Sequence, residues 1–181
     1  MSIETEVKIK IDDIEGFCLQ LGALKPAIAA ERHFEDNYLL DFPDQKINSS
    51  RCLLRIRCAK GSGFLTFKGP PRENGIFKTR EELETKLEDG TTVLQVLHRI
   101  GMSVFFQYQK YRREFTLDLV HVAVDETPIG NYAEFEGSEE GIRSLAGKMG
   151  IAESQFLRHS YYSLYLEYCR NKGVTPGFMI F

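Results

Sequence analysis

The first residues of the chain alternate between two kinds of side chain. From position 3 to position 11, the odd positions carry isoleucine, valine or threonine, and every even position carries a charge: Glu4, Glu6, Lys8 and Lys10. Successive side chains of a β-strand point to opposite faces, so this segment is predicted to be a strand with one apolar and one charged face. A strand lying between core and water shows the same alternation, which leaves the role of the charged face open.

Strand-like segments recur along the rest of the chain. They lie at about 32–41, 51–59, 63–69, 76–87, 104–119, 121–126 and 131–137. Turn-rich pieces such as 61–63 and 69–71 separate them, and such short connections favour a mainly antiparallel sheet.

Apolar residues at helical spacing interrupt this series of strands. They predict amphipathic helices at 14–22, 93–101 and 142–150, each closed by a glycine. We expect these helices to cover the apolar side of the sheet. A last segment places Tyr161, Leu164, Tyr165 and Tyr168 on one helical stripe, a spacing more typical of core packing than of a ligand site.

Composition limits the class of protein. The chain has 181 residues, of which 43% are hydrophobic and 27% charged, and we expect a single domain over residues 1–181. Without an apolar run long enough to cross a bilayer or a secretory signal, we expect a cytoplasmic protein with no membrane partner. The net charge of −3 does not favour nucleic-acid binding. Four cysteines without CxxC spacing argue against a zinc site or disulfides.

Charged side chains share a strand face in several later segments as well. Arg55 and Arg57 alternate within one segment, and paired guanidinium groups suit phosphate oxygens because each donates two hydrogen bonds at once. Glu134 and Glu136 alternate in another, and carboxylates suit Mg²⁺ or Mn²⁺. For each pair alone, surface salt bridging is the alternative interpretation. Together the candidates are seven acids and seven bases: Glu4, Glu6, Glu82, Glu84, Asp125, Glu134, Glu136, Lys8, Arg55, Arg57, Lys68, Arg80, Lys110 and Arg112.

The order of these charges resembles that of a known family. The Glu-x-Glu-x-Lys spacing of Glu4, Glu6 and Lys8 is similar to the N-terminal hallmark of the CYTH family, also called the triphosphate tunnel metalloenzymes. The later matches occur in the family's order: Arg55-x-Arg57, Lys68, Arg80-x-Glu82-x-Glu84, Lys110-x-Arg112, Asp125 and Glu134-x-Glu136.

The resemblance implies a fold and a set of roles. The fold would be α+β, a closed antiparallel barrel of about eight strands that forms a charged tunnel, with helices packed outside. Basic residues would bind the phosphates: Lys8, Arg55, Arg57, Lys68, Arg80, Lys110 and Arg112. Carboxylates would hold Mg²⁺ or Mn²⁺: Glu4, Glu6, Asp125, Glu134 and Glu136. Glu82 and Glu84 would serve either metal or water, and the catalytic set would be Glu4, Glu6, Lys8, Glu82 and Glu84.

The resemblance also implies a small-molecule triphosphate substrate. Class IV adenylate cyclases of the family convert ATP to cyclic AMP and pyrophosphate, whereas its thiamine triphosphatases and tripolyphosphatases direct water to a terminal phosphorus. Segments 65–70 and 78–84 look like those of members named as cyclases, which favours that activity, with hydrolysis as the alternative. A non-catalytic polyphosphate-binding module and a plain interaction barrel remain as further alternatives.

Some polar and apolar features have no part in this set. The four histidines show no spacing to a shared partner, so we expect surface or structural roles for them. Asp36 and Tyr38 are similar to part of a family strand, with no site role assigned. The apolar tail at 178–181 indicates a contact with the barrel or with a second subunit, in a protein that we expect to be a monomer or a homodimer.

Overall fold

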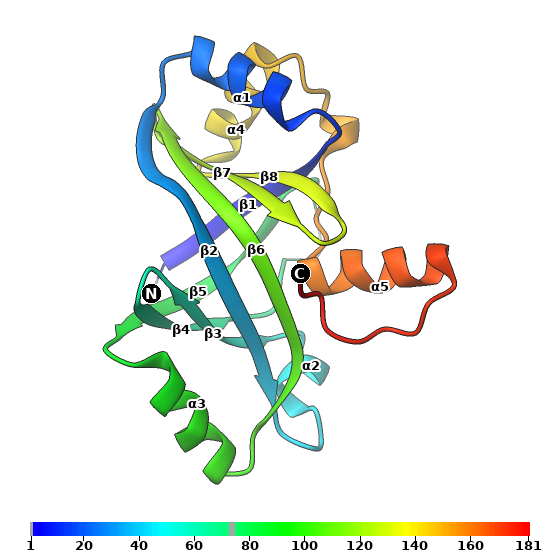
Figure 1. Cartoon of the computed structure of the whole chain (residues 1–181). Coiled ribbons are helices and arrows are strands. Elements are labelled where there is room, and N and C mark those ends of the chain that lie inside the picture. The colour runs from blue at the N-terminus through cyan, green and yellow to red at the C-terminus, as the bar shows by residue number, and fades with distance from the viewer. Residues whose placement is uncertain (1, 73–74) are drawn as a thin grey trace.

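The computed structural model of the chain describes residues 2–72 and 75–181. Within these ranges, eight strands close into an antiparallel barrel with the order β1-β5-β4-β3-β2-β6-β7-β8 (Figure 1). The predicted fold, a closed antiparallel barrel with helices outside, is therefore confirmed. The strands are β1 (Ser2–Ile11), β2 (Ala27–Asp41), β3 (Leu53–Ala59), β4 (Ser62–Lys68), β5 (Lys78–Leu87), β6 (Ser103–Leu117), β7 (Val120–Thr127) and β8 (Gly130–Glu136).

Helices lie on the outside of this barrel. The residue before each of the four longer helices caps it: its side chain accepts a hydrogen bond from a backbone N–H of the first turn. These capping residues are Asp13, Asp89, Ser138 and Ser160. Within the described ranges, none of the helices is long and apolar enough to span a membrane. The helices are α1 (Ile14–Ala23), α2 (Lys46–Ser49), α3 (Gly90–Arg99), α4 (Glu139–Lys148), α5 (Tyr161–Lys172) and the 3₁₀ turn η1 (Glu153–Gln155).

The main differences from the sequence-based prediction lie in β2, in α2 and in the 3₁₀ turn η1, which was not predicted. Strand β2 begins at Ala27, five residues before the predicted start at 32, and its first half pairs with β6 through register shifts between Ile28 and Ala30 and between Ala30 and His33. Such bulges break the two-residue alternation from which strands are predicted. Helix α2 was not predicted, because four residues are too few to show a helical repeat.

The largest hydrophobic core lies outside the barrel, between its wall and the helices α1 and α4. Val7, Val122 and Phe135 point outward from β1, β7 and β8 and are fully buried beneath this layer, together with Leu21 of α1 and Ile142 of α4. Figure 1 shows the two helices side by side over these strands. Each such side chain contributes about 1.5–3 kcal/mol by its burial. Because the apolar faces point outward to the helices, the charged faces of the same strands point into the barrel.

Helix α5 and the C-terminal tail cover another part of the wall. Leu164 of α5 packs in a cluster with Phe106 of β6 and with Met179, which is 1% exposed. The backbone N–H of Gln109 donates to the carbonyl of Met179 at 2.9 Å, and the N–H of Met179 donates to the carbonyl of Gln107 at 2.9 Å. The tail therefore docks on its own barrel, one of the two contacts that the sequence left open.

The docked tail gives a first test of the fold. We expect Met179→Ala to lower the free energy of unfolding by about 2 kcal/mol, because truncating a buried methionine leaves a cavity. The neighbouring Ile180 is 45% exposed, and Ile180→Ala should change stability by less than about 0.5 kcal/mol. Urea unfolding of both variants measures the difference, and equal losses would contradict the docking of the tail through Met179.

Candidate active site

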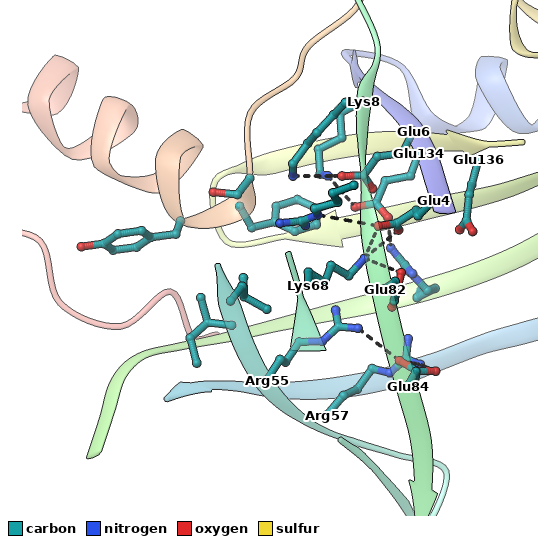
Figure 2. A pocket seen from close by; sticks show the side chains of 18 of the residues that line it. Glu4, Glu6, Lys8, Arg55, Arg57, Lys68, Glu82, Glu84, Glu134 and Glu136 are labelled. Carbon is teal, nitrogen blue, oxygen red and sulfur yellow. Dashed lines mark hydrogen bonds and ion pairs between the residues drawn. The ribbon is translucent and has the colours of Figure 1, made fainter. Parts of the chain in front are cut away.

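The inward faces of the strands line a cavity of about 390 Å³ in the barrel. All but one of the fourteen charged residues proposed from the sequence line this lumen, and Figure 2 shows ten of them converging from several strands. The strand register explains the convergence: Glu6 of β1 pairs with Lys78 of β5 on one side and with Glu136 of β8 on the other. Closure of the sheet thus brings residues far apart in the sequence onto one inner surface. The exception is Asp125.

A first cluster of charges is built around Lys68 of β4. Its Nζ donates to both carboxylate oxygens of Glu4, at 2.6 Å each, and lies 2.9 Å from Glu82. Arg80 approaches the same Glu4, with Nε 3.8 Å from Oε2. One lysine therefore balances two carboxylates of neighbouring strands, with a guanidinium beside them.

A second cluster surrounds Glu6. Lys78 Nζ donates to Glu6 Oε1 at 2.9 Å, and Lys8 Nζ lies 3.6 Å from the same oxygen. Lys8 also lies 3.1 Å from Glu134 of β8. The side chains of Lys8 and Glu6 are only 5% and 7% exposed, so these ions sit where solvent screens them little.

A third cluster lies nearer to solvent. Arg57 donates to Glu84 at 3.2 Å, and Arg55 reaches the same carboxylate at 3.5 Å. The hydroxyl of Thr66 donates to Glu84 at 2.7 Å. Because the Glu84 side chain is 31% exposed, its pairing with the arginines is the weakest of the three. Both guanidinium groups remain directed at the cavity (Figure 2).

Asp125 is placed behind the lumen and does not line it. It is fully buried and accepts hydrogen bonds from Lys110 at 3.0 Å, from Arg112 at 2.7 and 2.6 Å, and from the Tyr161 hydroxyl at 2.5 Å. A carboxylate so fully supplied with donors orients the groups around it. Lys110 and Arg112 are held by it with their charges towards the cavity.

The pKa values of the carboxylates divide into two groups. Burial opposes ionisation of Glu6, but Lys78 and Lys8 outweigh it and hold its pKa far below the ordinary range. The pKa of Glu134 is also well below the ordinary range, because the charges of Lys8 and Arg112 outweigh the effect of burial. In contrast, burial together with the charges of Glu6 and Glu82 raises the pKa of Glu4 to about 7, and burial raises that of Glu136.

This donor set fits a hard divalent cation. Within residues 2–72 and 75–181, no three acidic, histidine or cysteine side chains converge on one point, since most of the carboxylates pair with bases. Glu4 and Glu136 nevertheless carry raised pKa values beside other carboxylates. A cation would offset the cost of ionising these buried carboxylates and the repulsion between them. Carboxylate oxygens are the ligands that Mg²⁺ and Mn²⁺ prefer.

Several lumen residues were not predicted from the sequence, among them Lys78 and Glu114. Lys78 lies two residues before Arg80 and four before Glu82, so the same alternation could have identified it as an inward residue. Glu35 of β2 is 2% exposed and does not itself line the cavity, but its carboxylate lies 3.5 Å from two residues that do, Lys110 and Arg57.

Two of the four histidines contact the same carboxylate. His33 Nε2 lies 3.7 Å from Glu114 Oε1 and 3.5 Å from Glu35, and His121 Nε2 lies 3.1 Å from Glu114 Oε2. His121 and Glu114 both line the lumen. These contacts cross from β2 to β6 and from β6 to β7, so no local spacing in the sequence indicated them.

The fold and the site define a closed antiparallel β-barrel with a lumen lined by paired charges. Comparisons with known sequences identify the family. A family model described as the CYTH domain matches residues 2–161, so the chain belongs to the CYTH family. A protein of Methanocaldococcus jannaschii provisionally named an adenylate cyclase is 29% identical over 90% of this chain and 98% of that protein.

Solved structures show the same fold. One from Vibrio parahaemolyticus, also provisionally named an adenylate cyclase, superposes with a TM-score of 0.78 at 19% identity, covering 89% of this chain and 96% of that one. A Hippeastrum protein, provisionally named an adenylyl cyclase and described as having a dominant triphosphatase activity, superposes with a TM-score of 0.69 at 17% identity. That match covers 96% of this chain and 97% of the Hippeastrum chain.

The raised pKa of Glu4 predicts an unusual stability effect. In the unfolded chain this carboxyl ionises near pH 4.5, whereas in the fold it keeps its proton until about pH 7. Ionised Glu4 therefore costs stability above pH 4.5, and the cost is absent below it. We expect Glu4→Gln to stabilise the metal-free protein by about 1–3 kcal/mol at pH 8 and to have little effect at pH 4.5.

Glu82 provides the matched control, because its substitution should change stability in the opposite direction to that of Glu4. Lys68 holds its pKa below the ordinary value against the effect of burial, so ionised Glu82 contributes stability above its unfolded pKa. Glu82→Gln should destabilise the protein at pH 8. Thermal unfolding of both variants at the two pH values tests the pair, and a loss of stability in Glu4→Gln at pH 8 would contradict the assignment.

Proposed function

We propose that this protein is a divalent-metal-dependent enzyme that binds a triphosphate in the barrel lumen and cleaves a phosphoanhydride bond. The observation that carries the proposal is the convergence of eight basic side chains on one cavity inside the barrel: Lys8, Arg55, Arg57, Lys68, Lys78, Arg80, Lys110 and Arg112. A triphosphate carries several negative charges along an extended chain, and a cavity lined with bases on several strands matches that distribution.

The chemistry that such a lumen supports is positioning and charge neutralisation. Phosphoryl and nucleotidyl transfer need little covalent participation by the protein. In this proposal Lys68 and Arg57 hold phosphate oxygens, and Asp125 orients Lys110 and Arg112 without binding metal. Mg²⁺ or Mn²⁺ bound by Glu4, Glu6, Glu134 and Glu136 would neutralise charge and activate the nucleophile, while Glu82 and Glu84 serve metal or water.

Two reactions fit this arrangement. In a cyclase, the ribose 3′-hydroxyl of ATP attacks the α-phosphorus, loses its proton and releases pyrophosphate. In a triphosphatase, water attacks a terminal phosphorus and releases orthophosphate. The provisional names of the M. jannaschii and Vibrio relatives favour the cyclase, and the activity described for the Hippeastrum protein favours the triphosphatase. We propose the cyclase reaction first, with hydrolysis of thiamine triphosphate or tripolyphosphate as the alternative.

Product analysis separates these reactions. We expect ³¹P NMR of the purified protein with Mg²⁺ or Mn²⁺ to show pyrophosphate and cyclic AMP from ATP, and no turnover with a chelator present. If orthophosphate forms from ATP, thiamine triphosphate or tripolyphosphate, the protein is a triphosphatase and the cyclase assignment is wrong. No product from any of the three substrates would contradict an enzymatic function.

Substitutions in the lumen separate binding from turnover. Arg57→Ala should weaken binding of tripolyphosphate about tenfold or more, since hydrogen bonds to charged groups contribute about 1.5–3 kcal/mol. Glu136→Gln should abolish turnover while phosphate binding persists. Glu126→Gln is the control, because Glu126 pairs with Arg32 outside the lumen. Wild-type turnover in Glu136→Gln at limiting metal would remove that carboxylate from the metal set.

A further inference from the structure

Strand β6 reaches beyond its neighbour on one side of the sheet. Its pairing with β2 extends back to Ser103, whereas its pairing with β7 extends back only to Tyr111. The chain turns back after α5, and its C-terminal tail, residues 178–181, lies against this stretch of β6 (Figure 1). There Met179 forms a parallel bridge with Tyr108. The tail thus takes the place of a neighbouring strand where β7 does not reach.

Two backbone hydrogen bonds hold β6 on either side of Tyr108. Both involve Met179, which accepts from the N–H of Gln109 and donates to the carbonyl of Gln107, each at 2.9 Å. The side chain of Gln109 adds a third contact, since its Oε1 accepts from the N–H of Phe181 at 3.3 Å. The tail therefore fixes the backbone of β6 at the position of Tyr108, as a neighbouring strand does within a sheet.

The side chains of this bridge lie in an apolar cluster beside the lumen. Residues opposite one another in a bridge point to the same face of a sheet, and the buried Met179 and Tyr108 belong to one cluster with Tyr161. The ring centroid of Tyr108 lies 5.6 Å from that of Tyr161 and 5.8 Å from that of Phe106. Tyr108 lines the lumen, whereas Met179 is not among the lining residues. Met179 can therefore act on a ligand in the lumen only through its neighbours.

The Tyr108 hydroxyl links this cluster to a basic residue of the lumen. It accepts a hydrogen bond from Nη1 of Arg55 at 3.4 Å, and Nη2 of Arg55 donates to the Thr66 hydroxyl at 3.2 Å. Arg55 also lies 3.5 Å from Glu84, whose side chain is 31% exposed. This exposed carboxylate is the contact that a phosphate would replace, so Tyr108 and Thr66 are left to orient the guanidinium. An arginine that is already oriented loses less side-chain freedom when it binds a ligand.

We propose that the C-terminal tail is part of the phosphate-binding site, with Met179 as a positioning residue that acts through Tyr108 on Arg55. This inference rests on the proposed function, in which Arg55 binds the triphosphate, and it adds an element that does not line the lumen. Docking of the tail orders Tyr108, Tyr108 orders Arg55, and the ordered guanidinium binds phosphate oxygens more tightly. The phosphate affinity of the lumen therefore depends on the last residues of the chain.

Titration of tripolyphosphate into the metal-free protein tests this proposal. Calorimetry is done at a temperature at which circular dichroism shows every variant to be folded. We expect Met179→Ala to weaken binding about three- to tenfold, the loss that follows from a weakened hydrogen bond. Met179→Leu keeps the apolar volume and should restore the affinity to within about twofold of the unmodified protein. Ile180→Ala is the control, because the neighbouring Ile180 is 45% exposed, and it should leave the affinity unchanged.

A double-mutant cycle shows whether the effect passes through Arg55. Tyr108→Phe removes only the hydroxyl and keeps the packing of the ring, and it should also weaken binding about three- to tenfold. In an Arg55→Ala background, Met179→Ala and Tyr108→Phe should each weaken binding less than about twofold further, because the group that they position is gone. Losses of full size in that background would overturn the proposal, since the tail would then act on the lumen by another route.

The inference and the proposed function fail in different ways. If the unmodified protein binds tripolyphosphate and Met179→Ala binds it equally well, the positioning role of the tail is wrong and the proposed function stands. The same holds if Arg55→Ala leaves the affinity unchanged, because the tail would then have no phosphate-binding group to position. If the unmodified protein does not bind tripolyphosphate, the proposed function is wrong and this inference with it.

Discussion

The structure depends on the pairing of charges that a closed barrel removes from water. An ion buried without a partner costs several kcal/mol, and removing one member of a buried pair is strongly destabilising. Lys78 with Glu6 and Lys8 with Glu134 satisfy this constraint between neighbouring strands. The apolar residues of the same strands then face outward, which is why the main core forms between the barrel and its helices.

The same pairing links the ligand-free state to function. A phosphate chain offers Lys68 and its neighbours the same kind of oxygen acceptor that Glu4 now supplies. In the proposed function, ligand and carboxylate would compete for the same donors, and a carboxylate displaced from its base would become available to a cation. On this account the phosphates and the metal bind with positive coupling, because each relieves a charge imbalance left by the other.

The sequence predicted most of the wall of the lumen and less of its surroundings. Alternation with a period of two located the strands and most of the inward charges, because parity decides which face a strand residue occupies. Glu35, which lies beside Lys110 and Arg57, was not among the candidates, although the strand register around it is regular. Parity was also unable to show that Asp125 lies behind the lumen under Tyr161, since that contact joins β7 to a distant helix.

The most direct test of this account is a crystal structure of the protein with tripolyphosphate in a chelating buffer. The account predicts phosphate oxygens within hydrogen-bond distance of Lys68 and Arg57, and a distance from Lys68 to Glu4 longer than the 2.6 Å of the ligand-free barrel. An anion bound outside the barrel, or a lumen in which every pair keeps its present distance, would contradict it.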